Sequence, residues 1–175
     1  MDFSRFKTSD WLKVGGAAGM LIFGLFSWVS GAGSSGNAFD FFFTGTIPWI
    51  LIVGVGVISL LLAGGAMKRD GAPWDAILLL ASALGALLVL IRLIIGPKID
   101  FGGVEIEFDR GVGLFLSTAA AIVCAIGCYL GFTEHGGNVA KMGDAFKKPV
   151  GSGGMAPPPP PGGAPPPPPP PPPVV

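Results

Sequence analysis

Four long apolar stretches divide this chain, and the clearest of them covers residues 74–95. Between Asp75 and Arg92 this stretch contains no charged residue. An α-helix of this length would measure about 33 Å, because a helix rises about 1.5 Å per residue. That length matches the roughly 30 Å hydrocarbon core of a bilayer, whereas helices in soluble cores are usually shorter. We therefore interpret residues 74–95 as a membrane-spanning helix.

The boundaries of this helix carry the expected signals. Pro73 is tolerated at the first helical position, and Asp75 lies in the first turn, near the positive end of the helix dipole. Gly96 is typical of a helix end. The three other apolar stretches are comparable, so the sequence predicts an all-α membrane protein, a four-helix transmembrane bundle with spans at about 11–30, 48–67, 73–95 and 111–132.

Composition agrees with this fold class. Charged residues make up 13% of the chain, against about 25% in an average soluble domain. The formal net charge is zero, which gives no reason to expect a nucleic-acid partner. We divide the chain into a transmembrane domain, residues 1–135, and a cytoplasmic Gly/Pro-rich tail, residues 136–175, which we expect to be disordered.

Orientation follows from the basic residues, which concentrate on the cytoplasmic side of membrane proteins. If both termini are cytoplasmic, eight Lys and Arg residues lie in inner segments, and the outer loops 31–47 and 96–110 contain only Lys98 and Arg110. The tryptophans fall near the predicted span ends, with Trp28 and Trp49 at the outer interface. We expect a multi-pass plasma-membrane protein with cytoplasmic N and C termini.

The first span has a competing interpretation as a secretory signal peptide. A basic start precedes an apolar run, and Ser30-Gly31-Ala32 resembles a small-residue cleavage site. Cleavage there would leave the topology of the remaining chain unchanged.

Arg92 is the basic residue inside a predicted span, and charges inside membranes are often functional because they are costly there. It lies one turn from the outer end of its helix, so its side chain can instead reach the interface or pair with a carboxylate of the next loop. The spans offer no second ionisable residue at mid-depth, which disfavours a proton or ion pathway.

The outer loop 96–110 contains a strand signal. Residues 104–109 alternate apolar and acidic side chains, and residues 39–43 form a second possible strand. We expect these two segments to pair as a small extracellular β-hairpin cap. Four carboxylates of this loop either bind Ca²⁺ or form a solvated acidic face: Asp100, Glu105, Glu107 and Asp109. Arg110, which ends the loop, is a further interaction candidate.

Small residues recur at four-residue spacing, which lets helices approach closely in lipid. They include Gly15 and Gly19, Ala81 and Gly85, and the stripe Gly113, Ser117, Ala121 and Ala125. This pattern predicts a tight bundle, or packing between copies or with a larger membrane complex. Cys124 and Cys128 share one helix face, either as small packing residues or with Cys128 as a lipidation site.

The tail carries two proline runs, residues 157–161 and 165–173. Nine consecutive prolines form extended polyproline II of about 28 Å. This rod is either a ligand for an aromatic-lined groove of a cytoplasmic partner or a semi-rigid spacer. Contact positions along the longer run are Pro165, Pro169 and Pro173.

Four short motifs resemble those of small four-span membrane proteins of actinobacteria, including mycobacteria, which often end in a Pro-rich cytoplasmic tail. The motifs are Ser9-Asp10-Trp11-Leu12, Pro48-Trp49-Ile50-Leu51, Phe101-Gly102-Gly103-Val104 and the segment 109–116. The resemblance covers roughly residues 9–132. It implies a plasma-membrane location and supplies no catalytic residue.

The sequence contains no constellation of nucleophile and base, no phosphate-binding loop and no metal-ligand cluster. We therefore expect no enzyme, no cofactor and no metal site. The predicted function is a non-enzymatic membrane scaffold or accessory subunit that packs with itself or a larger complex. The alternative is a small channel or transporter.

Overall fold

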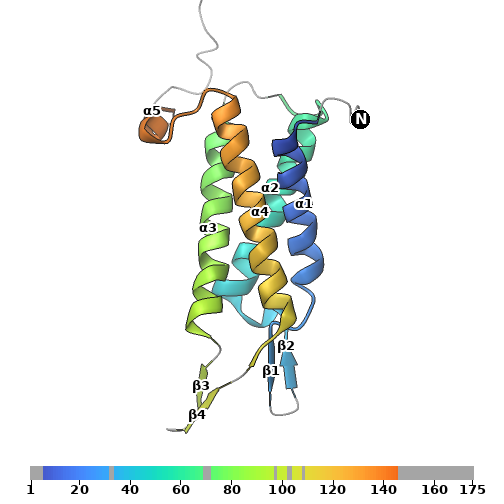
Figure 1. Cartoon of the computed structure of the whole chain (residues 1–175), viewed down its shortest axis with the longest axis vertical. Helices are drawn as coiled ribbons and strands as arrows, with labels where there is room; N and C mark the ends of the chain where they lie inside the picture. The colour runs from blue at the N-terminus through green and yellow to red at the C-terminus, as the bar shows by residue number, and fades with distance from the viewer. Residues whose placement is uncertain are drawn as a thin grey trace, which may run out of the picture.

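The computed structural model describes residues 6–31, 34–68, 72–96, 98–101, 104–107 and 109–145. This part is mostly helical, and four α-helices lie side by side along one axis (Figure 1). α1 and α3 each pack against both α2 and α4, so the four helices form a square bundle. Their bounds are α1 (Thr8–Phe23), α2 (Ile47–Ala63), α3 (Trp74–Ile95) and α4 (Val112–Glu134), and the short helices η4 (Val139–Lys141) and α5 (Met142–Ala145) follow.

The two ends of the bundle differ in what they carry. At one end α1 and α3 begin and α2 and α4 end; we call it the charged end. At the other end lie the strands, and we call it the strand end (Figure 1). Because consecutive helices run in opposite directions, residues 7–13 lie near residues 131–135, far apart in sequence.

Three helices of the described part are long and apolar enough to cross a membrane: residues 42–63, 74–95 and 112–134. The first consists of α2 preceded by a π-helical turn, η3 (Phe42–Thr46). Large apolar side chains cover the outward faces of the bundle, as expected for helices in contact with lipid tails. They include Leu21, Ile22, Val57, Leu80, Leu84, Leu87, Ile122, Val123 and Ile126.

α1 is shorter than predicted. It has 16 residues, about 24 Å, and a span usually needs about 20 residues. The predicted first span, 11–30, therefore began three residues late and ended seven residues late. The helix stops at Phe23 because the chain turns at Gly24, whose backbone is packed against the Trp49 indole.

Trp28 departs from the prediction in its environment. The sequence placed it at the membrane interface, but its side chain is 0% exposed within the bundle. Its indole Nε1 donates a hydrogen bond of 3.2 Å to the Phe23 carbonyl oxygen at the end of α1, which also accepts from the Phe26 backbone N–H. Trp28 thus fixes the turn that ends α1.

The predicted strand at residues 39–43 is wrong. The segment forms a 3₁₀ turn, η2 (Ala38–Asp40), followed by η3. Asn37 Oδ1 accepts from the Phe39 backbone N–H at 2.9 Å, and Asp40 Oδ2 accepts from the Asn37 N–H at 2.6 Å. This reciprocal capping favours a helical turn, and the run of Phe residues gave no sign of it.

The strands pair differently from the prediction. β4 (Val104–Glu107) pairs antiparallel with β3 (Lys98–Phe101), with Ile99 opposite Ile106, and not with residues 39–43. A second sheet has the order β2-β1-β5 and joins β1 (Val29–Gly31), β2 (Ser34–Gly36) and β5 (Asp109–Arg110). The predicted strand 104–109 is therefore divided between two sheets, and Phe108 lies outside the described residues.

Small residues allow the helices to approach closely. A Cβ at Gly16 would lie 2.6 Å from the Cys124 backbone nitrogen, and a Cβ at Gly85 would lie 3.0 Å from the Ile52 side chain. Gly113, Ser117 and Ala121 are buried inside the bundle. The predicted stripe on α4 therefore packs within one chain. On α1 the predicted Gly19 lies at the contact with α4, where a Cβ would lie 3.0 Å from the Ala120 Cβ, whereas the predicted Gly15 has no atom within 4 Å and the neighbouring Gly16 makes the contact instead.

Candidate functional site

A buried ion pair lies inside the charged end. Lys13 Nζ is 3.1 Å from Asp10 Oδ1, and the two side chains are 3% and 10% exposed. The other oxygen of Asp10 accepts from the Lys7 backbone N–H at 3.3 Å. Both partners belong to the first turns of α1, so the ammonium and the carboxylate neutralise each other where water is excluded.

Two glycines of α4 make room for Lys13. A Cβ at Gly131 would lie 2.5 Å from Lys13 Nζ, and a Cβ at Gly127 would lie 2.7 Å from the Lys13 backbone nitrogen. A side chain at either position would displace α1 or expose the ion pair. The pair therefore depends on the close contact between α1 and α4.

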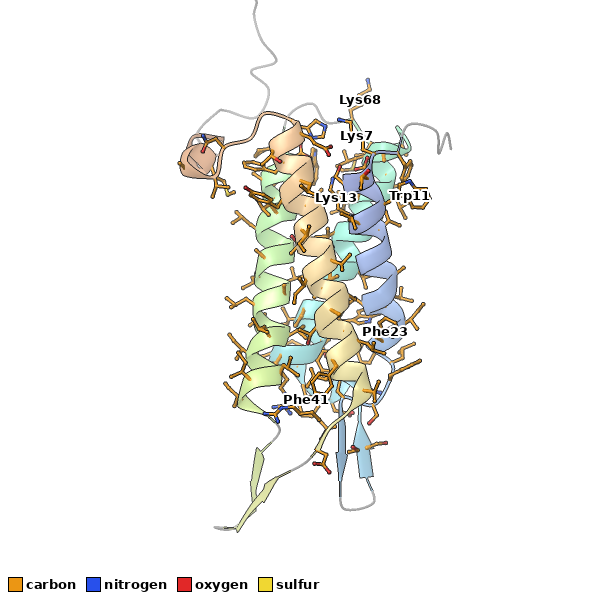
Figure 2. The ribbon with its side chains drawn as sticks, viewed as in Figure 1. Lys7, Trp11, Lys13, Phe23, Phe41 and Lys68 are labelled. Carbon is orange, nitrogen blue, oxygen red and sulfur yellow. The ribbon has the colours of Figure 1, made fainter. Side chains whose placement is uncertain are left out.

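Glu134, the last residue of α4, ties this helix to the start of α1. Ser9 Oγ donates a hydrogen bond of 2.9 Å to Glu134 Oε2, and Lys7 Nζ lies 3.7 Å from the same oxygen. Figure 2 shows Lys7, Lys13, Trp11 and Lys68 gathered at this end of the bundle.

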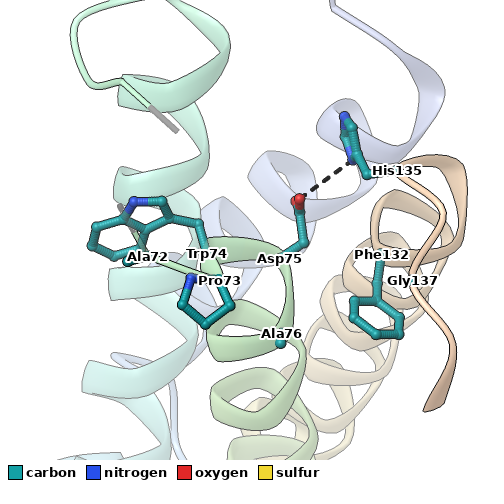
Figure 3. Close-up of a pocket in the computed structure, with 8 residues that line it drawn as sticks. All are labelled: Ala72, Pro73, Trp74, Asp75, Ala76, Phe132, His135 and Gly137. Atoms are coloured by element: carbon teal, nitrogen blue, oxygen red, sulfur yellow. Dashed lines mark ion pairs between the residues drawn. The ribbon is translucent and has the colours of Figure 1, made fainter. Parts of the chain in front are cut away.

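His135, the next residue, faces α3. Its Nδ1 lies 2.6 Å from the Gly131 carbonyl oxygen and 3.5 Å from Asp75 Oδ2 (Figure 3). Asp75 belongs to the first turn of α3, so the pair joins α3 to α4. Beside it lies a pocket of about 170 Å³, lined by Ala72, Pro73, Trp74, Asp75, Ala76, Phe132, His135 and Gly137.

The two cysteines lie deeper in the bundle. Both are free thiols and fully buried. They lie four residues apart on the buried face of α4. Among the residues that the structure describes, no group of three His, Cys, Asp or Glu side chains is placed to hold a metal ion. The arrangement is that of packed thiols, and their burial leaves Cys128 unsuited to lipidation in this conformation.

At the strand end, two arginines lie at the C-terminus of α3: Arg92 in its last turn and Arg110 in β5. The guanidinium carbon of Arg92 lies 3.9 Å from the centre of the Phe41 ring, and its buried Nε has no hydrogen-bond partner. Arg110 donates from Nε to the Leu93 carbonyl oxygen at 2.8 Å and from Nη2 to that of Ile94 at 3.2 Å. Arg110 therefore caps the C-terminus of α3, and Arg92 stacks on an aromatic ring.

The predicted site residues whose side chains the structure describes lie in different places. Arg92 and Arg110 both lie at the end of α3, and Asp109 is exposed in β5. Asp100, Glu105 and Glu107 lie in β3 and β4, of which the structure describes the backbone alone. Pro165, Pro169 and Pro173 lie outside the described residues, as does the whole tail from residue 146.

Sequence reasoning missed the polar groups of the charged end. Neither Asp10 nor Lys13 is among the predicted site residues, because the first span was expected to start at Trp11. A helix starting at Thr8 places Ser9, Lys13, Gly16 and Met20 on one face by their spacing of three and four. That periodicity was the available signal.

A scan against protein-family models, a search of curated proteins and a search of solved structures found no match to this chain. The likeness to small actinobacterial membrane proteins stays a prediction from the motifs alone. The three membrane-length helices are consistent with a membrane protein.

Proposed function

We propose that the chain is a non-enzymatic integral membrane scaffold or accessory subunit. In this proposal its four helices cross the plasma membrane, the charged end and both termini are cytoplasmic, and the strand end forms an outer cap. The bundle packs with further copies or with a larger membrane complex, and the proline-rich tail engages a cytoplasmic partner.

The observation that carries the proposal is the distribution of charge along the bundle. The charged side chains of the four bundle helices lie in the first two turns or the last turn of α1, α3 and α4, towards the two ends. The sides between them expose aliphatic residues on every helix. A bilayer selects this arrangement, because charges are tolerated near the interfaces and are costly at the centre.

The short length of α1 is compatible with a fourth span. Beyond Phe23 the backbone is not helical, but its polar groups bond to neighbouring segments. Ala38 N–H donates to the Gly24 carbonyl at 3.1 Å, Gly113 N–H to that of Ser27 at 2.9 Å, and Gly111 N–H to that of Trp28 at 2.9 Å. Irregular backbone is tolerated at membrane depth when it is satisfied by protein in this way.

Topology is tested by labelling intact cells. We expect an epitope tag after residue 175 to be detected only after permeabilisation, and a cysteine introduced at Ser35 to react with an impermeant maleimide from outside. Cys124 and Cys128 are buried and provide a low background. Detection of the C-terminal tag in intact cells would reject the proposed topology.

Scaffolding is tested by photo-crosslinking in native membranes. Leu84 and Ile126 are exposed on α3 and α4, so a photoreactive residue at either position should give discrete protein adducts. Val89, which is fully buried, is the matched control and should give none. Repeating the experiment without residues 151–175 separates bundle partners from tail partners. A monomer without adducts at both exposed positions would contradict the proposal.

One observation favours the alternative, a small channel or transporter. The buried hydroxyls of Ser59 and Ser117 have no hydrogen-bond partner, and buried polar groups usually have one, often water. If water reaches them along a conduction path, reconstituted vesicles should show solute or ion flux that Ser117→Ala reduces. Absence of flux supports the scaffold.

A further inference from the structure

Two amphipathic aromatic side chains lie on the outside of the bundle near the charged end. Trp11 of α1 is 54% exposed, and Tyr129 of α4 is 50% exposed. We propose that these two rings together bind the headgroup region of a lipid bilayer, and so fix the level at which the inner membrane surface crosses the bundle. This inference rests on the proposed function, in which the helices span a membrane and the charged end is cytoplasmic.

The close contact between α1 and α4 sets the two rings at the same depth. A Cβ at Gly127 would lie 2.8 Å from the Leu12 Cβ, and a Cβ at Gly131 would lie 3.7 Å from the Ser9 Cβ. Because α4 runs antiparallel to α1, Tyr129, midway between these two glycines, lies level with the α1 segment between Ser9 and Leu12. The exposed tryptophan belongs to that segment, and Figure 2 shows it at the charged end.

The exposed side chains of the two helices change character at this level. Towards the strand end they are apolar, as Ile22 on α1 and Ile126 on α4 are. Towards the charged end they include Lys7 before α1 and Glu134 at the end of α4. Tryptophan and tyrosine are enriched where lipid tails meet headgroups, because their rings are apolar and their N–H and O–H groups can bond to lipid oxygens. The position of the two rings therefore fits this boundary.

The length of α4 beyond Tyr129 fits the thickness of a bilayer. From Tyr129 back to Val112, the first residue of α4, a rise of about 1.5 Å per residue gives about 26 Å. No charged residue lies between these two positions. Since the hydrocarbon core is roughly 30 Å thick, a membrane whose inner surface lies at Tyr129 has its outer boundary near the strand end, where α4 begins.

The buried ion pair lies close to the same depth. Lys13 Nζ lies against Gly131, two residues beyond Tyr129 on α4. The aromatic rings thus face outwards, while Lys13 and Asp10 are buried between α1 and α4. Charges are tolerated near a membrane interface and are costly at the centre. The proposed level therefore accounts for two buried charges in a helix that also faces lipid.

The experiment places the full chain in lipid nanodiscs and measures the quenching of tryptophan fluorescence by brominated phospholipids. Bromine atoms near the ester end of the chains report a shallow position, and bromine atoms near the methyl end report a deep one. Tyr129→Trp puts the fluorophore at the proposed level. Ile122→Trp is the matched control, because Ile122 is also exposed on α4 and lies about 10 Å deeper. After subtraction of the parent signal, we expect stronger shallow quenching for Tyr129→Trp and stronger deep quenching for Ile122→Trp.

The ring on α1 is tested in the natural sequence. Trp11→Phe should reduce the part of the parent fluorescence that shallow bromine atoms quench, because the Trp11 ring is exposed. Trp28→Phe removes a fully buried indole and should leave that part unchanged. An unchanged shallow signal in Trp11→Phe would overturn the assignment of Trp11. The comparison of Tyr129→Trp with Ile122→Trp does not depend on either of these variants.

Two results at residue 129 would overturn the proposal. Deep quenching as strong as shallow quenching would place this level inside the hydrocarbon core. No quenching by either lipid would show that water or another protein covers the position. In both cases deep quenching of Ile122→Trp would still support the membrane-spanning bundle, so failure of this inference and failure of the proposed function are distinguishable. Absence of quenching at both residues 122 and 129 would reject the two together.

Discussion

The two ends of the bundle hold the helices together by different chemistry. At the charged end, polar side chains at the ends of different helices contact carboxylates, as Lys7 and Ser9 contact Glu134 and His135 contacts Asp75. At the strand end, the contacts of Arg110 are backbone carbonyls, and Arg92 stacks on the Phe41 ring. The first end joins side chains to carboxylates, with Lys7 and Glu134 as a pair of opposite charges, whereas the second joins cations to neutral groups.

Because of this difference, we expect substitutions at the two ends to respond differently to salt. Contacts between two ionised side chains depend on both charges and on salt where they are exposed. Contacts from a cation to a carbonyl or a ring depend on geometry and change less with ionic strength. Substitutions at the two ends should therefore separate by salt dependence as well as by magnitude.

The largest effect is expected for Lys13→Ala. Removing one partner leaves the Asp10 carboxylate buried and unpaired, which should lower the free energy of unfolding by about 3–5 kcal/mol. Denaturant unfolding of the detergent-solubilised chain, followed by circular dichroism, measures this loss. The control Lys68→Ala removes an exposed ammonium at the same end and should stay within about 0.5 kcal/mol of the parent. Equal losses for the two substitutions would show that the buried ion pair contributes no more to the free energy of unfolding than an exposed ammonium does.

The second-largest effect is expected where α1 and α4 are in close contact at the charged end. Gly127→Ala places a methyl group against the Lys13 backbone and should destabilise the bundle by about 1–3 kcal/mol. Gly15→Ala is the matched control, because Gly15 is helical and has no neighbour within 4 Å, so it should stabilise by up to about 1 kcal/mol. The same unfolding measurement compares the two, and a stabilising Gly127→Ala would contradict the observed packing of α1 on α4.

At the strand end, Arg110→Met removes the two hydrogen bonds that cap α3. We expect a loss of about 1 kcal/mol, because each bond is partly replaced by water. The loss should be the same at low and high salt, since the acceptors are neutral carbonyls. Arg110→Lys keeps the charge without the forked geometry and should recover only part of the loss. Full recovery by lysine would indicate that charge, and not capping, matters at this end.

The smallest effect is expected for Glu134→Gln. The Lys7–Glu134 pair is exposed and 3.7 Å long, so its loss should cost less than about 1 kcal/mol. The cost should fall further in 1 M salt, where the Debye length is about 3 Å. Unfolding at both salt concentrations provides the test. A cost that does not change with salt would remove the distinction drawn between the two ends.

The sequence alone predicted the structure correctly where an element depends on signals from neighbouring residues. α3 begins and ends within one residue of the prediction, because Pro73 and Gly96 bound an uninterrupted apolar run. α4 and the end of α2 were also predicted to within a few residues. The strand at residues 104–107 followed from alternation, which likewise needs only neighbouring residues.

The sequence was insufficient where structure depends on distant contacts. Trp28 looked like an interfacial residue because nothing in its neighbours indicates the bundle that covers it. Asp109 is separated from the predicted strand 104–109 because it and Arg110 pair with β1, some 80 residues earlier. The pocket at Asp75 needed His135 from another helix. In each case the decisive partner lies far along the chain.

The adjacent positions of Glu134 and His135 have a mechanical consequence. These two residues end α4, and each contacts a different neighbour, the start of α1 and the start of α3. Residue 135 is also the last residue before the segment that leads to the proline tail. Any pulling force that reaches the end of α4 from the C-terminal side is therefore shared by these two contacts between two neighbouring helices.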